Sequence, residues 1–213
     1  MEVASKPDTT SRILDVSERL FVEHGFEGTS LRMITQQAGV NLAAVNYHFG
    51  SKDKLFESVF LRRLAPLISA CLSELDQLEA LPEPGVEGLV MSFIRPCLML
   101  SKDPSRGGAM FVRLLSRTLV ENHRVLRDTL SQQYSVFVER YSAAFSRVLP
   151  ELPAEELAWR MHFSFSVMFN AFAGNDVLKI FTRSQVVSAR DPDMIVKHLL
   201  PYVVSALVAP ARS

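Results

Sequence analysis

The sequence predicts an all-α protein. Apolar residues recur at three- and four-residue spacings in one segment after another, which is the period of an amphipathic helix. Proline- and glycine-bearing breaks, such as Leu81-Pro-Glu-Pro-Gly85 and Pro150-Glu-Leu-Pro153, separate these segments. The alternating patterns of strands and the Asn-Gly signals of hairpins are absent from the sequence.

The first helix is expected over residues 9–24, where apolar residues including Ile13, Leu20 and Phe21 share one face and Gly25 provides a stop. Two short helical patterns follow on either side of a turn at Gly39-Val40-Asn41. A fourth helix is expected to begin after Ser51, a capping residue, and to run to about Ala80.

After the break at residues 81–85 the pattern predicts five further helices. Their expected ranges are Val86–Leu100, Ser105–Leu119, His123–Leu149, Ala154 to about Thr182, and Asp193–Val208. The chain is accordingly divided into residues 1–52, a three-helix domain, and residues 53–213, a larger helical domain.

Composition excludes disordered, collagen-like and low-complexity proteins. The 213 residues include 23 basic and 23 acidic side chains and are 48% hydrophobic, so the chain can bury a core and has no charge bias that indicates a partner. The densest apolar runs, Phe163–Ala173 and Leu199–Ala209, reach about half of the roughly 20 residues that a membrane span requires. The start of the chain lacks a secretory signal pattern, and Cys71 and Cys97 lie in apolar segments, which favours a cytoplasmic protein with reduced thiols.

The segment Thr29–Lys52 has the pattern of a helix-turn-helix. Gly39 permits the sharp turn between its two helices. The inner face carries apolar residues that would hold the two helices together: Ile34, Ala38, Val40, Val45 and Phe49. The outer face of the second helix carries small and polar residues that fit a DNA major groove: Asn41, Leu42, Ala43, Ala44, Asn46, Tyr47 and His48. Asn46 is suited to a bidentate contact with adenine, whereas Leu42, Ala43 and Ala44 suit thymine methyl groups.

The stretch from about Ile13 to Phe60 resembles the amino-terminal domain of the TetR family of bacterial transcriptional regulators. The resemblance depends on Leu20-Phe-x-x-x-Gly25-Phe26, Thr29-Ser30, Ala38-Gly39-Val40 and Tyr47-His-Phe-Gly-Ser-Lys52. It implies a dimeric repressor that binds a pseudo-palindromic DNA operator and an all-α carboxy-terminal domain that binds a small effector. The start of the recognition helix, Asn41-Leu-Ala-Ala44, is similar to that of a subset that includes fatty-acid-responsive members.

The resemblance also implies roles for individual residues. Phosphate contacts are expected from Thr29, Tyr47, His48 and Lys52, and base contacts from Asn41 to Asn46. Ser30 is a further candidate for DNA binding. Arg32 suits either purpose, and the region of Lys6 and Arg12 would add backbone contacts. Dimerisation is expected through the last two long helices, whose apolar residues exceed what a single buried face requires.

Aromatic and methionine residues between positions 93 and 172 form the expected core of the larger domain, and some would line an apolar effector pocket. The candidates for the pocket are Phe93, Phe111, Phe137, Trp159, Met168 and Phe169, with Arg113 and His162 beside a ligand head group. Arg117, Arg160, Asn170 and Asn175 are further polar candidates. The expected effector is a small hydrophobic molecule, with a fatty acid or an acyl-coenzyme A as examples.

The two other classes of function to compare are an enzyme and a helical module that binds another protein. Sequence motifs of hydrolases, dinucleotide- and phosphate-binding loops and metalloproteases are absent, and the histidines lack the spacing of a metal site, so we predict no enzyme, no metal and no cofactor. A helical module that binds another protein and not DNA remains the alternative, because residues 1–63 contain equal numbers of acidic and basic side chains. Salt dependence distinguishes the two, since DNA binding releases counterions.

Overall fold

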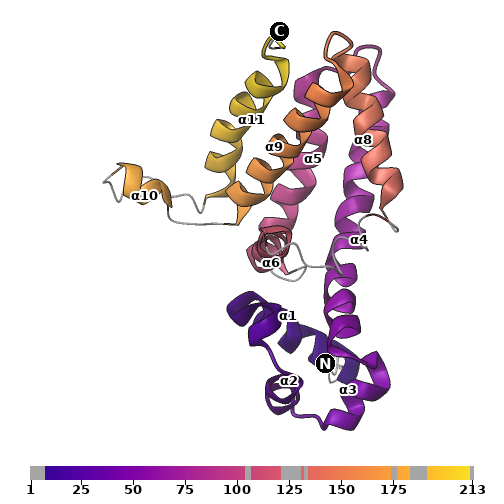
Figure 1. Cartoon of the computed structure of the whole chain (residues 1–213), viewed down its shortest axis with the longest axis vertical. Coiled ribbons are helices and arrows are strands. Elements are labelled where there is room, and N and C mark those ends of the chain that lie inside the picture. Colours follow the sequence, from indigo (N-terminus) through magenta and orange to yellow (C-terminus); the bar gives the residue numbers. More distant parts are fainter. Residues whose placement is uncertain are drawn as a thin grey trace, which may run out of the picture.

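The structure is a computed structural model that describes residues 8–103, 107–120, 131, 134–173, 177–182 and 191–211. Every regular element in these ranges is an α-helix, which confirms the predicted class. Figure 1 shows a three-helix unit at one end, formed by α1 (Thr9–Gly28), α2 (Leu31–Ala38) and α3 (Leu42–Phe49), from which the long helix α4 (Lys52–Glu79) leads into a bundle.

Side-chain caps start α2, α3 and α4, and the cap predicted at Ser51 is confirmed. The Ser30 hydroxyl accepts a hydrogen bond from the Met33 amide at 3.2 Å, the Asn41 side chain accepts one from the Ala44 amide at 2.8 Å, and Ser51 accepts one from Lys54 at 3.2 Å. α1 runs past its predicted stop to Gly28, but Gly25 within it has φ +73°, so the regular helix does break there.

The core of the three-helix unit includes the start of α4. The Phe56 ring packs edge-on against Phe21 at 4.8 Å and against Phe26 at 5.0 Å between ring centroids. The predicted inner residues Ile34, Ala38, Val45 and Phe49 are all buried. The unit is therefore closed by the first turns of α4.

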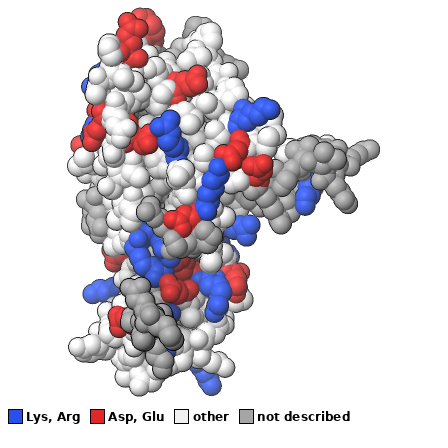
Figure 2. Space-filling model, turned by 180° about the vertical axis from the view of Figure 1, so that it is seen from behind, with Lys and Arg blue, Asp and Glu red and all other residues white. Residues whose placement is uncertain are grey.

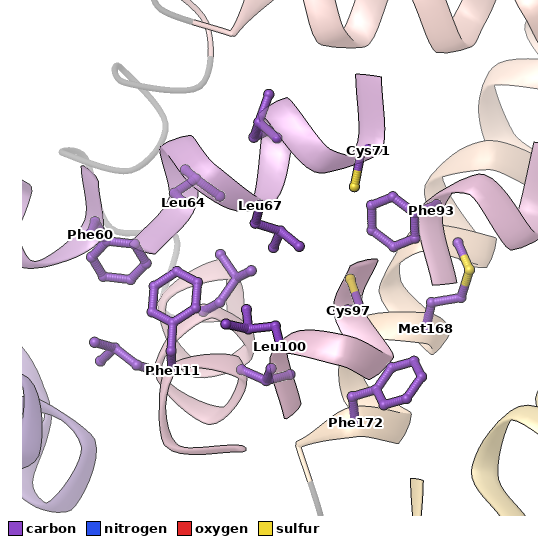
Figure 3. Packing of buried hydrophobic residues seen from close by; sticks show 14 of the residues in the cluster. Phe60, Leu64, Leu67, Cys71, Phe93, Cys97, Leu100, Phe111, Met168 and Phe172 are labelled. Carbon is purple, nitrogen blue, oxygen red and sulfur yellow. The ribbon is translucent and has the colours of Figure 1, made fainter. Parts of the chain in front are cut away.

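The bundle consists of α4 together with α5 (Val86–Ser101), α6 (Gly108–Val120), α8 (Ser135–Val148), α9 (Ala154–Phe172) and α11 (Pro192–Val208). α5 packs against α4 and α11, and α11 packs against α9. Figure 3 shows how α4, α5, α6 and α9 bring their apolar side chains together, with Cys71 and Cys97 among them. Both thiols are free and buried.

The single helix predicted from Ala154 to about Thr182 is wrong. α9 ends at Phe172, and a separate short helix, α10 (Val177–Thr182), follows. The start predicted at Ser105 and the first part of the helix predicted from His123 lie outside the described residues. In the described ranges, none of the helices has the length and apolar character needed to cross a membrane.

Candidate nucleic-acid interface and effector cavity

The recognition helix α3 exposes one face and buries the other. Val45 and Phe49 are buried, whereas Asn46 and His48 are exposed and Tyr47 is 86% exposed. Asn41, Ala43 and Leu42, which is 50% exposed, lie at the exposed start of the same helix, and Ala44 is half-buried. The exposed face of α3 thus presents both apolar groups, on Leu42 and Tyr47, and polar groups, on Asn46 and His48.

Contacts with α1 hold the carboxy-terminal end of α3 and the lysine that follows it. At its end, His48 Nδ1 lies 3.3 Å from the Thr10 hydroxyl of α1, and the Tyr47 and His48 rings meet edge to face. Just beyond, the Lys52 ammonium lies 4.1 Å from the centroid of the Phe26 ring, a cation–π contact that holds this lysine beside the recognition helix.

Thr29, for which a phosphate contact was predicted, is buried in the structure. Its side chain is buried at 1% exposure, and its hydroxyl donates to the carbonyl oxygens of Gly25 at 2.7 Å and Leu20 at 3.1 Å. Thr29 therefore satisfies carbonyl groups exposed by the break in α1. Ser30 and Arg32 are both exposed at the start of α2.

Charged side chains of both signs lie side by side on the surface of the molecule. Figure 2 shows acidic and basic side chains interspersed over one face of the molecule. On the face that Figure 2 shows, no field of one sign among the described residues indicates a binding partner.

The bundle contains an apolar cavity of about 370 Å³ between α4, α5, α6, α8 and α9. The described lining residues are Leu64, Leu67, Ile68, Cys71, Phe93, Leu115, Phe137, Val138, Tyr141, Ser142, Ala158, Met161, His162, Phe165 and Phe169. None of these is Lys, Arg, Asp or Glu. A cavity of this size and character suits a small apolar ligand.

Of the eight residues predicted for the pocket, Phe93, Phe137, His162 and Phe169 line this cavity. The others lie elsewhere: Phe111 packs against Phe60, Met168 is buried outside the described lining, and Trp159 is 54% exposed and stacks on Phe163. The Arg113 guanidinium is exposed and donates to the Ala173 carbonyl at 2.9 Å.

Tyr141, a buried residue with a polar hydroxyl, lines the cavity although it was not among the predicted residues. Its hydroxyl lies 3.0 Å from the Ser92 hydroxyl and donates to the Cys71 carbonyl at 3.2 Å. Burial raises the pKa of Tyr141 well above its ordinary value and likewise raises the pKa of the Cys71 thiol, so both groups stay uncharged at neutral pH. The four-residue spacing of Phe137 and Tyr141 places both on one face of α8, and this spacing could have indicated that Tyr141 lies beside the predicted pocket residue Phe137.

The further polar candidates do not meet in the cavity lining. Arg160 pairs with Glu156 and donates to the Leu207 and Pro210 carbonyls at the end of α11. Arg117 reaches toward α1, and Asn170 is exposed on α9. Asn175 lies outside the described residues, as does Lys6.

A three-helix unit that exposes a recognition helix, attached to a helical bundle, defines a helix-turn-helix DNA-binding protein. A family profile described as bacterial regulatory proteins, tetR family, matches residues 13–59, and a second, described as the Tetracyclin repressor-like C-terminal domain, matches residues 91–206. The chain belongs to the TetR family. It is a DNA-binding transcriptional regulator and not an enzyme.

Individual relatives agree with this assignment. The chain is 32% identical over 151 residues to the transcriptional repressor AcnR of Corynebacterium glutamicum. The aligned residues make up 69% of this chain and 71% of that protein. With AcnR of Corynebacterium efficiens the identity is 41% over 59 residues, 26% of this chain and 31% of that protein.

Solved structures share the fold. A transcriptional regulator from Rhodococcus sp. Rha1 aligns with a TM-score of 0.58 at 20% identity, covering 94% of this chain and 96% of that one. The fatty acid degradation regulator FadR from Bacillus halodurans aligns with a TM-score of 0.59 at 14% identity, covering 92% and 96%. At these identities the likeness concerns the fold alone.

Proposed function

We propose that the protein is a homodimeric cytoplasmic repressor that occupies a pseudo-palindromic operator and leaves it when a small hydrophobic molecule enters the cavity. The observation that carries the proposal is the pairing, in one chain, of an exposed recognition helix with an apolar cavity in the adjoining bundle. The AcnR relatives are named as transcriptional repressors, which supports repression rather than activation.

In this proposal α3 reads the bases and its surroundings hold the phosphates. Asn46 offers the amide group for an adenine contact, and the exposed Leu42 and Ala43 meet thymine methyl groups. Tyr47, His48, Lys52, Ser30 and Arg32 contact phosphates, which sets the register of α3 without specifying sequence. Asn41 contributes its amide donors, because its side-chain oxygen already caps α3.

The dimer interface is proposed on the outer face of α9 and α11. Large apolar side chains remain exposed there, including Phe163 at 58% and Tyr202 at 62%, which border the same groove between the two helices. Trp159, 54% exposed, stacks on Phe163 and extends the apolar surface. A contiguous apolar surface of this kind marks a protein interface, and pairing with the same helices of a second chain forms a four-helix bundle.

The lining of the cavity supports an effector with an apolar body. The aromatic side chains that surround Phe93, which meets Phe165 at 4.7 Å and Phe169 at 5.3 Å between centroids, favour an acyl chain or a ring system. His162, exposed at the surface of α9, is the described lining residue placed to meet a polar head group, as in a fatty acid or an acyl-coenzyme A.

The alternative of a helical module that binds only proteins loses its basis, because the family assignment explains the exposed face of α3. In the proposed mechanism the two recognition helices of the dimer enter successive major grooves about 34 Å apart. The effector stabilises a conformation with a different separation, and by linkage operator DNA weakens effector binding by the same factor.

The first test is selection of bound duplexes from a random DNA pool by the purified protein at moderate salt, followed by sequencing. Enrichment of a two-fold symmetric site supports a dimeric, sequence-specific repressor and supplies the operator. A panel of acyl chains is then titrated with and without that operator. Equal affinity for the acyl chain in both titrations contradicts release by that effector.

A further inference from the structure

Helix α6 lies between the three-helix unit and the other helices of the bundle (Figure 1) and packs against α1, α5 and α9. On its cavity side, Leu115 contributes to the lining, and the Ser116 hydroxyl donates at 2.8 Å to the carbonyl of Phe169, another lining residue. α6 is thus held against the walls of the cavity.

On its opposite side α6 holds α1 through Arg117. Two residues along an α-helix differ in direction by about 200°, so Leu115 and Arg117 point to opposite sides. The Arg117 guanidinium lies directly against Gly25: a Cβ placed on this glycine would stand 2.4 Å from Nη2, 2.8 Å from Cζ and 3.1 Å from Nε. The guanidinium therefore fills the space that the absent side chain leaves.

The same guanidinium meets the end of the regular part of α1. Nη1 donates to the Val22 carbonyl at 3.4 Å, just before Gly25 interrupts the helix with φ +73°. Carbonyl groups at a helix end lack intrahelical partners and carry the negative end of the helix dipole, so a cation is favoured there. Geometry and charge consequently both place Arg117 at this end of α1.

We propose that Arg117 is a positioning residue that fixes the orientation of the DNA-binding unit relative to the bundle and links this orientation to the cavity through Leu115. The inference rests on the proposed function of a dimeric repressor. Arg117 contacts no base in this proposal. It acts through α1. This helix packs against α2, and its Thr10 contacts His48 at the end of the recognition helix.

The test uses spin-label distances in the full-length protein. A labelled cysteine at exposed Gln36 of α2 reports the separation of the two DNA-binding units, and one at Met99 of α5, 62% exposed, reports the separation of the bundles. The native thiols do not interfere, because both are buried and burial raises the pKa of Cys97 to about 12.

Arg117→Met removes the charge and keeps most of the length, and Arg117→Lys restores the charge. Arg113→Met is the matched control, since this arginine lies one turn earlier on α6 and bonds to α9. We expect Arg117→Met to broaden the Gln36 distance distribution and to lower operator affinity about three- to tenfold, as only part of the population keeps the binding geometry. Arg117→Lys and Arg113→Met should stay near the parent protein, and the Met99 distances should not change.

An unchanged Gln36 distribution in Arg117→Met overturns the proposal, and so does equal broadening by Arg113→Met. Absence of any dipolar signal at both label sites in the parent protein refutes the dimer of the proposed function instead. Amide hydrogen exchange then decides the role of Arg117, because it needs no dimer: Arg117→Met must speed exchange in residues 19–24 of α1, and Arg113→Met must not. Arg117→Gln replaces the methionine variant if that variant does not fold.

Discussion

Glu18 of α1 forms the most buried ion-pair cluster among the described residues, and its neutralisation by Glu18→Gln provides a quantitative test. Its carboxylate, 4% exposed, accepts hydrogen bonds from Arg62 at 2.6 Å and from Arg63 at 3.2 Å, which ties α1 to α4. Removing one partner of a buried pair typically costs 3–5 kcal/mol, or about 1.5–3 kcal/mol for a bond to a charged group. Because Arg62 and Arg63 keep 23% and 16% exposure, we expect Glu18→Gln to lower the free energy of unfolding by about 2–3 kcal/mol.

Asp15→Asn is the matched control, since Asp15 binds the same Arg62 at 2.7 Å but is 60% exposed. An exposed pair contributes about 0–1 kcal/mol. Urea unfolding at one fixed protein concentration measures both variants, and the slope with denaturant must stay unchanged for the comparison to hold. If Glu18→Gln costs no more than Asp15→Asn, burial does not strengthen this cluster and the reasoning fails.

Three further outcomes are expected. Asn46→Ala should relax preference at one base position by about 1–3 kcal/mol, whereas Lys52→Ala should weaken binding to all sequences and lower the salt slope by about one, as measured by titration of operator variants at several salt concentrations. Phe163→Glu, which places a charge on the exposed face of α9, should yield monomers in sedimentation velocity, and retention of the dimer would contradict the proposed interface. Burial raises the pKa of Cys97 from 9.0 to about 12, so the folded state holds the proton that the unfolded state loses; the free energy of unfolding should fall between about pH 9 and 12, and less steeply in Cys97→Ala.

The three-helix unit was predictable because its signals are local. Ser30, Asn41 and Ser51 cap the helices that follow them, and Ile34, Val45 and Phe49 are buried as their spacing indicates. Such signals depend on residues a few positions apart, and tertiary packing here agrees with them.

The cavity was only partly predictable because helical spacing identifies apolar faces without saying what each face meets. Trp159 and Phe169 belong to the same helix, yet one is exposed beside Phe163 and the other lines the cavity. The end of α9 was missed although Gly174-Asn175 follows it closely in the sequence, and these residue types favour helix ends. Thr29 is a similar case. The role that the family resemblance implies for it does not reveal that its hydroxyl donates to the Gly25 carbonyl of its own chain.

The continuity of α4 determines how such a regulator can be recombined with others. A cut between residues 52 and 53 separates Phe56 from Phe21 and Phe26 and leaves the transplanted unit with an open core. A cut after Phe60 keeps those rings together, but it parts Glu18 from Arg62 and Arg63. Exchange of DNA specificity between relatives, in evolution or in the laboratory, therefore requires a seam beyond Arg63 or a recipient helix with arginines at the same two positions.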